Sequence, residues 1–104
     1  DMNLINQLGG YHQAKNWLDK NEIHVKHGYL EKYRAELFQH RREHGIFEVG
    51  DSFLNYGDDQ VYKVATVNVG NLRGHSGDDI VWTYVGRFGL RHATDEEIKA
   101  GHRL

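Results

Sequence analysis

Residues 38–45, FQHRREHG, contain two histidines and a glutamate in the spacing H-x-x-E-H. On a helix, His40 and His44 would lie four positions apart on one face, where two imidazoles can bind one metal ion. One group of zinc peptidases uses this spacing to bind zinc and to activate water. The motif therefore makes a metal-dependent hydrolase one of the functions to consider.

The surroundings of the motif argue against catalysis. Catalytic zinc needs a third protein ligand and an open coordination position, and Gly45 is expected to end the helix at once. Cations gathered at the end of a helix also complement its dipole, which explains the same residues without a metal. We predict no catalytic residues, no metal site and no cofactor. A non-catalytic metal site formed by His40, His44 and either His24 or His27 is kept as an alternative.

The same helix end is rich in arginine, with Arg34, Arg41 and Arg42 close together. Arginines on a helix can hold phosphates, so this end makes a nucleic-acid-binding regulator the main alternative function. The whole chain nevertheless has a net charge of −2, which does not favour a general polyanion binder. Arginine is also enriched at protein-binding hot spots.

A glycine-rich stretch follows later in the chain, at Gly70–Asp78, and carries Arg73 and His75. It lacks the G-K-[ST] of a phosphate-binding loop and precedes an expected strand rather than a helix. We expect a long, flexible hairpin loop that can contact a partner. The predicted partner-binding residues are Arg34, Arg41, Arg42, Arg73 and His75.

The composition is that of a globular domain. The chain has 104 residues, of which 38% are hydrophobic, and six Tyr, four Phe and two Trp supply large rings for a core. Cysteine is absent, which removes disulfide and thiolate chemistry. No run of apolar residues approaches the length of a membrane span, so we expect no membrane partner.

The periodicity predicts helices first and strands afterwards. Residues 3–21 have helical spacing, and Gly9-Gly10 is expected to break them into a short turn and a helix from Tyr11 to about Lys20. A connector at 22–27 leads to a second helix from about Tyr29 to His44. Strands are expected at Phe53-Leu54, at 60–69 and at 79–87.

The strand at 79–87 carries apolar groups on both faces, with Ile80, Trp82 and Tyr84 on one of them. This favours a central position or a curled sheet. At the end of the chain, Thr94-x-x-Glu97 is a capping box that begins a short helix, which Gly101 ends.

We therefore predict an α+β fold. A helical pair at about 3–45 packs on a small antiparallel sheet at about 46–90, curled towards a barrel, and a C-terminal helix at about 94–100 closes a single domain of residues 1–104.

Two segments carry a resemblance. "YRAELFQHRREHGIFEVGD" at 33–51 and "RHATDEEIKAGHRL" at 91–104 resemble small accessory proteins of tailed phages and prophages. The resemblance implies a non-enzymatic protein that binds and redirects a host protein, in the cytoplasm of a bacterial host. A phage-encoded modulator or inhibitor of a host protein is the leading functional hypothesis, and the oligomeric state is not predicted.

Overall fold

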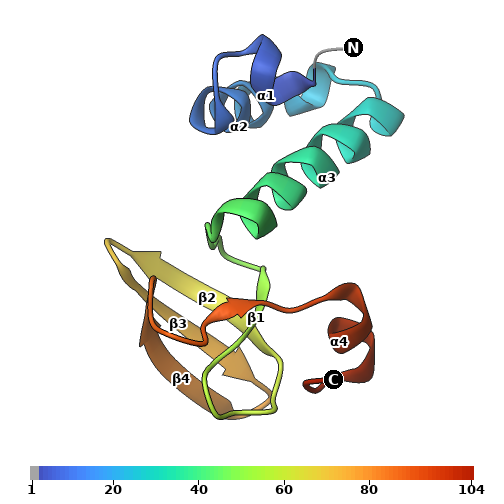
Figure 1. The fold of residues 1–104 in the computed structure, drawn as a ribbon. Coiled ribbons are helices and arrows are strands. Elements are labelled where there is room, and N and C mark those ends of the chain that lie inside the picture. Colours follow the sequence, from blue (N-terminus) through green and yellow to red (C-terminus); the bar gives the residue numbers. More distant parts are fainter. Residues whose placement is uncertain (1–2) are drawn as a thin grey trace. The chain divides into compact units, whose positions relative to one another are not determined.

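The computed structural model describes residues 3–104 and is drawn in Figure 1. The chain divides into two compact units, the first ending at His44 and the second spanning Gly45–Leu104. The first contains helices, and the second contains a five-stranded antiparallel sheet and one further helix. The α+β class is thus confirmed, while the grouping of both units into a single domain stays a prediction. Among residues 3–104, no helix combines the length and apolar character needed to cross a membrane.

The first unit contains three α-helices and a short 3-10 helix. The predicted break at Gly9-Gly10 is confirmed, because both glycines have positive φ, at 85° and 132°. The last helix begins two residues before the predicted Tyr29 and ends before Gly45, as expected. The elements are α1 (Leu4–Gln7), α2 (Tyr11–Asn21), η1 (Glu22–His24) and α3 (His27–His44).

A carboxylate on α3 holds α1 in place. The two Glu36 oxygens accept hydrogen bonds from the backbone N–H groups of Leu4 and Ile5, at 3.1 and 2.9 Å. These amides belong to the first turn of α1, where no helical carbonyl is in reach. Burial of apolar side chains stabilises the same contact. The buried set is Leu4, Ile5, Tyr11, Ala14, Leu18 and Leu37.

The second unit is an open sheet. Its strand order is β4-β3-β2-β1-β5, with every neighbouring pair antiparallel. The two ends of this order do not pair with each other, so the expected curling towards a barrel is not found. The strands are β1 (Ser52–Leu54), β2 (Tyr62–Asn68), β3 (Asn71–Ser76), β4 (Asp79–Tyr84) and β5 (Arg91–His92), and the helix after them is α4 (Asp95–Ala100).

The glycine-rich stretch is a strand, and the prediction of a flexible loop there is wrong. Residues 71–76 form β3, which pairs with β2 on one side and β4 on the other. Gly74 is needed for space: a Cβ on it would lie 2.4 Å from Cζ of Phe53. The Phe53 ring is fully buried and packs against the backbone of β3 at this point. The glycine therefore marks a close approach within the sheet.

The position of the next strand also differs from the prediction. β4 is an edge strand, not a central one. Val81 and Thr83 face the core, whereas Ile80, Trp82 and Tyr84 are exposed. Both faces of β4 carry apolar groups because one packs on the core and the other forms a surface.

The packing of Phe53 on Gly74 generates a test. We expect Gly74→Ala to destabilise the protein by about 1–3 kcal/mol, since the new methyl group overpacks a filled core. Gly28→Ala is the matched control, because Gly28 lies in α3 with open space around it, and it should leave stability unchanged or raise it by up to about 1 kcal/mol. Denaturant unfolding measures both.

A double variant tests the contact itself. Phe53→Leu combined with Gly74→Ala should cost less than the sum of the two single changes, because the smaller side chain leaves room for the methyl group. A denaturant midpoint that Gly74→Ala leaves unchanged would contradict the proposed packing.

Candidate functional site

The exposed side of β3 and β4 gathers the surface aromatics of the sheet. Alternate residues of a strand face opposite sides, and the register pairs the exposed ones across the two strands. We call these six residues the outer face: the cross-strand pairs are Asn71 with Tyr84, Arg73 with Trp82, and His75 with Ile80. The residues between them, Leu72 and Thr83, are buried on the other side.

The apolar side chains of the outer face are open to solvent. Trp82 is 67% exposed, Ile80 is 63% exposed and Tyr84 is 50% exposed. A shallow hollow beside them is lined by Asn68, Asn71, Trp82, Thr83 and Tyr84. Three large apolar side chains in a row on one short strand form a contiguous patch, which is a feature of binding surfaces.

Arginines lie over both rings of the outer face. The Arg73 guanidinium carbon is 5.6 Å from the centre of the Trp82 ring. The Arg87 guanidinium carbon is 5.7 Å from the centre of the Tyr84 ring. Both distances permit a cation–π attraction, which holds each ring at the surface beside a positive charge. The site can therefore offer apolar contact and pair with an acidic group at the same place.

Two of the predicted partner-binding residues belong to this face. The sequence predicts Arg73 and His75 in a flexible loop, whereas the structure places both on β3 beside Trp82 and Ile80. His75 also lines a second hollow with residues of β2 and with Ile98 of α4.

The other three predicted residues lie in the first unit, on α3, where each contacts a neighbour. Arg34 forms an ion pair with Glu22. Arg41 donates a hydrogen bond of 3.2 Å to the Tyr11 hydroxyl. The Arg42 guanidinium carbon lies 4.2 Å from the centre of the Phe38 ring. Arg34 and Arg41 thus connect α3 to other helices of their unit, whereas the Arg42 contact lies within α3, and the role of all three towards a partner stays a prediction.

The histidines of the H-x-x-E-H motif are engaged with rings. The His40 ring stacks on Tyr11, with 5.1 Å between centroids, and lies 4.2 Å from the His44 ring. Within residues 3–104, no three His, Cys, Asp or Glu side chains lie close enough together to hold a metal ion. At the end of α3, the His40 ring thus packs between the rings of Tyr11 and His44.

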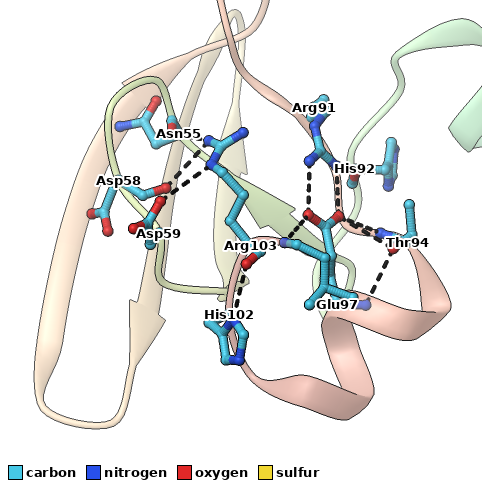
Figure 2. Close-up of polar contacts among 10 residues, drawn as sticks. Asn55, Asp58, Asp59, Arg91, His92, Thr94, Glu97, His102 and Arg103 are labelled. Carbon is cyan, nitrogen blue, oxygen red and sulfur yellow. Dashed lines mark hydrogen bonds and ion pairs between the residues drawn. The ribbon is translucent and has the colours of Figure 1, made fainter.

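A buried carboxylate forms the centre of a polar cluster at α4. Figure 2 shows Glu97, which is 2% exposed, with both carboxylate oxygens bound by the Arg91 guanidinium at 2.7 and 2.8 Å. The backbone amides of Thr94 and Leu104 donate to the same carboxylate at 3.0 and 3.1 Å. The Arg91 hydrogen bonds, helped by the Thr94 amide, hold the pKa of Glu97 well below its usual range. The predicted capping box is confirmed.

The chain end beyond α4 is tied to the turn after β1. Arg103 donates from its guanidinium to the backbone oxygens of Asn55 and Asp58, at 3.0 and 3.2 Å (Figure 2). In the same turn, the Asp58 carboxylate accepts a hydrogen bond of 2.5 Å from the Tyr62 hydroxyl, which raises the pKa of Tyr62 to about 12. A hydroxyl held in this way stays protonated and stabilises the turn.

The sequence contains a signal for the outer face. Ile80, Trp82 and Tyr84 stand at every second position of the sequence and so belong to one face of a strand. The other face of the strand is also apolar, however, and this suggests burial on both sides. Gly70 and Gly77 each lie in a two-residue hairpin loop and have positive φ. Two such glycines, seven positions apart, indicate two successive hairpins, so that β2, β3 and β4 form a meander. A meander of this kind leaves its last strand free to form an edge.

The chain was compared with protein-family models, curated protein sequences and solved structures, and no similar protein was found. The outer face and its neighbours therefore carry the evidence for a function. The resemblance to phage accessory proteins stays a hypothesis.

The Glu97 cluster predicts an acid-sensitive contribution to stability. Since the folded-state pKa is lowered, the contribution is present at neutral pH and is lost as the pH falls below the usual carboxyl range. We expect Glu97→Gln to cost roughly 1.5–3 kcal/mol at pH 7, as loss of hydrogen bonds to a charged group does, and less at pH 3.5. Thr94→Ala, which removes the cap hydroxyl, should cost about 0.5–2 kcal/mol at pH 7. Urea unfolding at pH 7 and 3.5 measures both; an equal loss for Glu97→Gln at the two values would exclude this linkage.

The stacked histidines predict that the purified protein binds no catalytic metal. Elemental analysis after dialysis against zinc should find well under one zinc per chain, with the same result for His44→Ala. One tightly held zinc per chain, lost in His44→Ala, would overturn this interpretation.

Proposed function

We propose that the protein is a non-enzymatic binding module that contacts a protein partner through the outer face of β3 and β4. The observation that carries the proposal is the row of exposed apolar side chains at Ile80, Trp82 and Tyr84, flanked by arginines. Trp, Tyr and Arg are the residue types most enriched at protein-binding hot spots. The sheet holds them in fixed positions, which lowers the entropy lost on binding.

The charge of the second unit supports a protein partner over nucleic acid. Residues 45–104 contain six Lys or Arg and nine Asp or Glu, a net charge of −3 (6 − 9). Asp78 and Asp79 lie at one end of the outer face, next to Ile80. A phosphate backbone would meet these carboxylates, whereas a protein surface of mixed charge can pair with them and with the arginines.

The identity of the partner rests on the resemblance alone. Residues 33–51 and 91–104 resemble phage accessory proteins, so we propose a bacterial host protein as the partner, met in the host cytoplasm. In this proposal the protein acts as a modulator or inhibitor by covering a surface of that host protein.

Single-stranded nucleic acid is the second candidate, because of one observation. Trp82 and Tyr84 lie two positions apart on one strand, each beside an arginine, and bases can stack on such a row. This candidate predicts quenching of tryptophan fluorescence by an oligonucleotide and binding that weakens steeply with salt.

The proposed function is tested by affinity capture with matched variants. The protein and its Trp82→Ala and Tyr84→Ala variants are used to capture proteins from bacterial lysate, and the captured proteins are quantified. We expect a defined protein that the wild type enriches and that each variant loses by about tenfold or more, as for a hot-spot residue.

Tyr29→Ala is the control for Tyr84→Ala, because Tyr29 is exposed to a similar extent, 54%, and lies on α3 in the first unit. It should retain the partner. A double variant, Arg41→Glu with Arg42→Glu, tests the other candidate surface, the end of α3 that the sequence predicts to bind a partner. Capture that survives both outer-face changes and fails after the reversal would move the site to α3, provided that circular dichroism shows the reversed protein to keep its helix content, since Arg41 also bonds Tyr11.

A further inference from the structure

The strand β2 continues the outer face on the far side of β3. Its exposed residues Lys63, Thr66 and Asn68 lie opposite outer-face residues of β3. Directly opposed residues of an antiparallel pair point to the same side of the sheet, so the surface is three strands wide. It consists of three cross-strand rows, which are Lys63 with His75 and Ile80, Thr66 with Arg73 and Trp82, and Asn68 with Asn71 and Tyr84.

A hollow at the first row joins the outer face to α4. Lys63 and His75 of the sheet and Ile98 of α4 all line it, so a basic group, an imidazole and an apolar side chain meet there. Among the described residues that line this hollow, none is acidic. Asp79 follows the turn at this end of the sheet, but its carboxylate acts on the Tyr62 hydroxyl, which belongs to the core side. The hollow is therefore suited to an anionic group.

The cations of this surface have no acidic partner in their own chain. Among the ion pairs within residues 3–104, none involves Lys63, Arg73 or Arg87. Each of these cations has an apolar neighbour instead. The two arginines lie over the aromatic rings described above, and Lys63 shares its hollow with Ile98. The surface thus presents positive charges interspersed with apolar side chains, and its complement carries negative charges interspersed in the same way.

We propose that the occupant of this surface is an extended acidic segment of the protein partner, with acidic and apolar side chains alternating along the side that faces the sheet. One acidic side chain enters the hollow, where the Lys63 ammonium and the His75 imidazole can donate hydrogen bonds to it. A second acidic side chain pairs with Arg73. The apolar side chains pack on Ile80 and Trp82. The inference rests on the proposed function, because it names the chemistry of the partner at the same site.

The size of the surface fits a short peptide segment. The first and third rows are four residues apart on β3, from His75 to Asn71, which is about 13 Å. An extended segment of about four or five residues covers this length and ends before the acidic turn at Asp78. A nucleic-acid strand carries a charge at every nucleotide, whereas a peptide can place an apolar side chain between two charges. The alternation of charge and apolar area therefore favours a peptide.

Binding of synthetic peptides to the intact chain tests the proposal, with the fluorescence anisotropy of the labelled peptide as the readout. The acidic probe repeats Glu-Glu-Leu-Leu over about ten residues, because this order puts both kinds of side chain on each side of an extended chain. Two control peptides carry Gln or Lys in place of every Glu. We expect the acidic probe to bind with a dissociation constant below about 1 mM, and each control peptide to bind at least about tenfold more weakly.

Charge reversal locates the probe on this surface. Lys63→Glu and Arg73→Glu should each weaken binding of the acidic probe about tenfold or more, because a like charge replaces the expected partner. Lys32→Glu is the matched control, since Lys32 is exposed on α3 in the first unit, and it should bind the probe like the wild type. The double variant Lys63→Glu with Arg73→Glu should bind the Lys-containing peptide more tightly than the wild type does, which a folding defect cannot produce.

Three results would overturn the proposal. The first is an acidic probe that does not bind at concentrations up to about 1 mM. The second is binding of the Gln-containing or Lys-containing peptide as tight as that of the acidic probe. The third is binding of the acidic probe that both charge reversals leave unchanged.

A single-stranded oligothymidylate is the probe for the competing class of ligand. If it binds more tightly than the acidic peptide and both charge reversals abolish its binding, the surface belongs to nucleic acid and the proposal is wrong. Failure of this inference is distinguishable from failure of the proposed function. If Trp82→Ala and Tyr84→Ala lose a captured host protein while the wild type shows no preference for the acidic probe, the binding module stands and only the acidic character of its partner is excluded.

Discussion

The close approach of Phe53 to Gly74 is the contact on which the sheet depends. The ring belongs to β1 and reaches under the backbone of β3, which is possible only because residue 74 has no Cβ. Phe47, Tyr62, Val64 and Leu72 complete the same cluster. This packing fixes β3 between β2 and β4, and it turns a polar, glycine-rich stretch into a regular strand. The alternation that follows directs Arg73 and His75 to the opposite side, where they flank the exposed aromatics.

The other end of the unit is fixed by charge rather than by apolar packing. Glu97 is removed from solvent, and such a carboxylate is tolerated only when hydrogen bonds replace its water. Arg91 supplies two of them, and the Thr94 and Leu104 amides supply two more. One side chain thereby connects β5, the start of α4 and the end of the chain. The outer face contains no part of this cluster, so its side chains are left for contacts.

The outer face and the edge of β4 offer two different kinds of recognition. Side chains of the face, Trp82 above all, offer apolar area beside positive charge. The edge offers backbone donors and acceptors.

The sequence by itself determined the local structure. The glycine break before Tyr11, the helix end at Gly45 and the capping box of Thr94 and Glu97 follow from backbone chemistry within a few residues, and each was predicted correctly. The tertiary structure decided what depends on distant neighbours. Gly74 suggests flexibility until Phe53, twenty-one positions earlier, is seen to need its space. The two apolar faces of β4 suggest burial on both sides, but the local pattern does not report whether a layer covers each face or whether a strand lies on each side. Strand order made β4 an edge, and the direction of Trp82, away from the core, made it a surface residue.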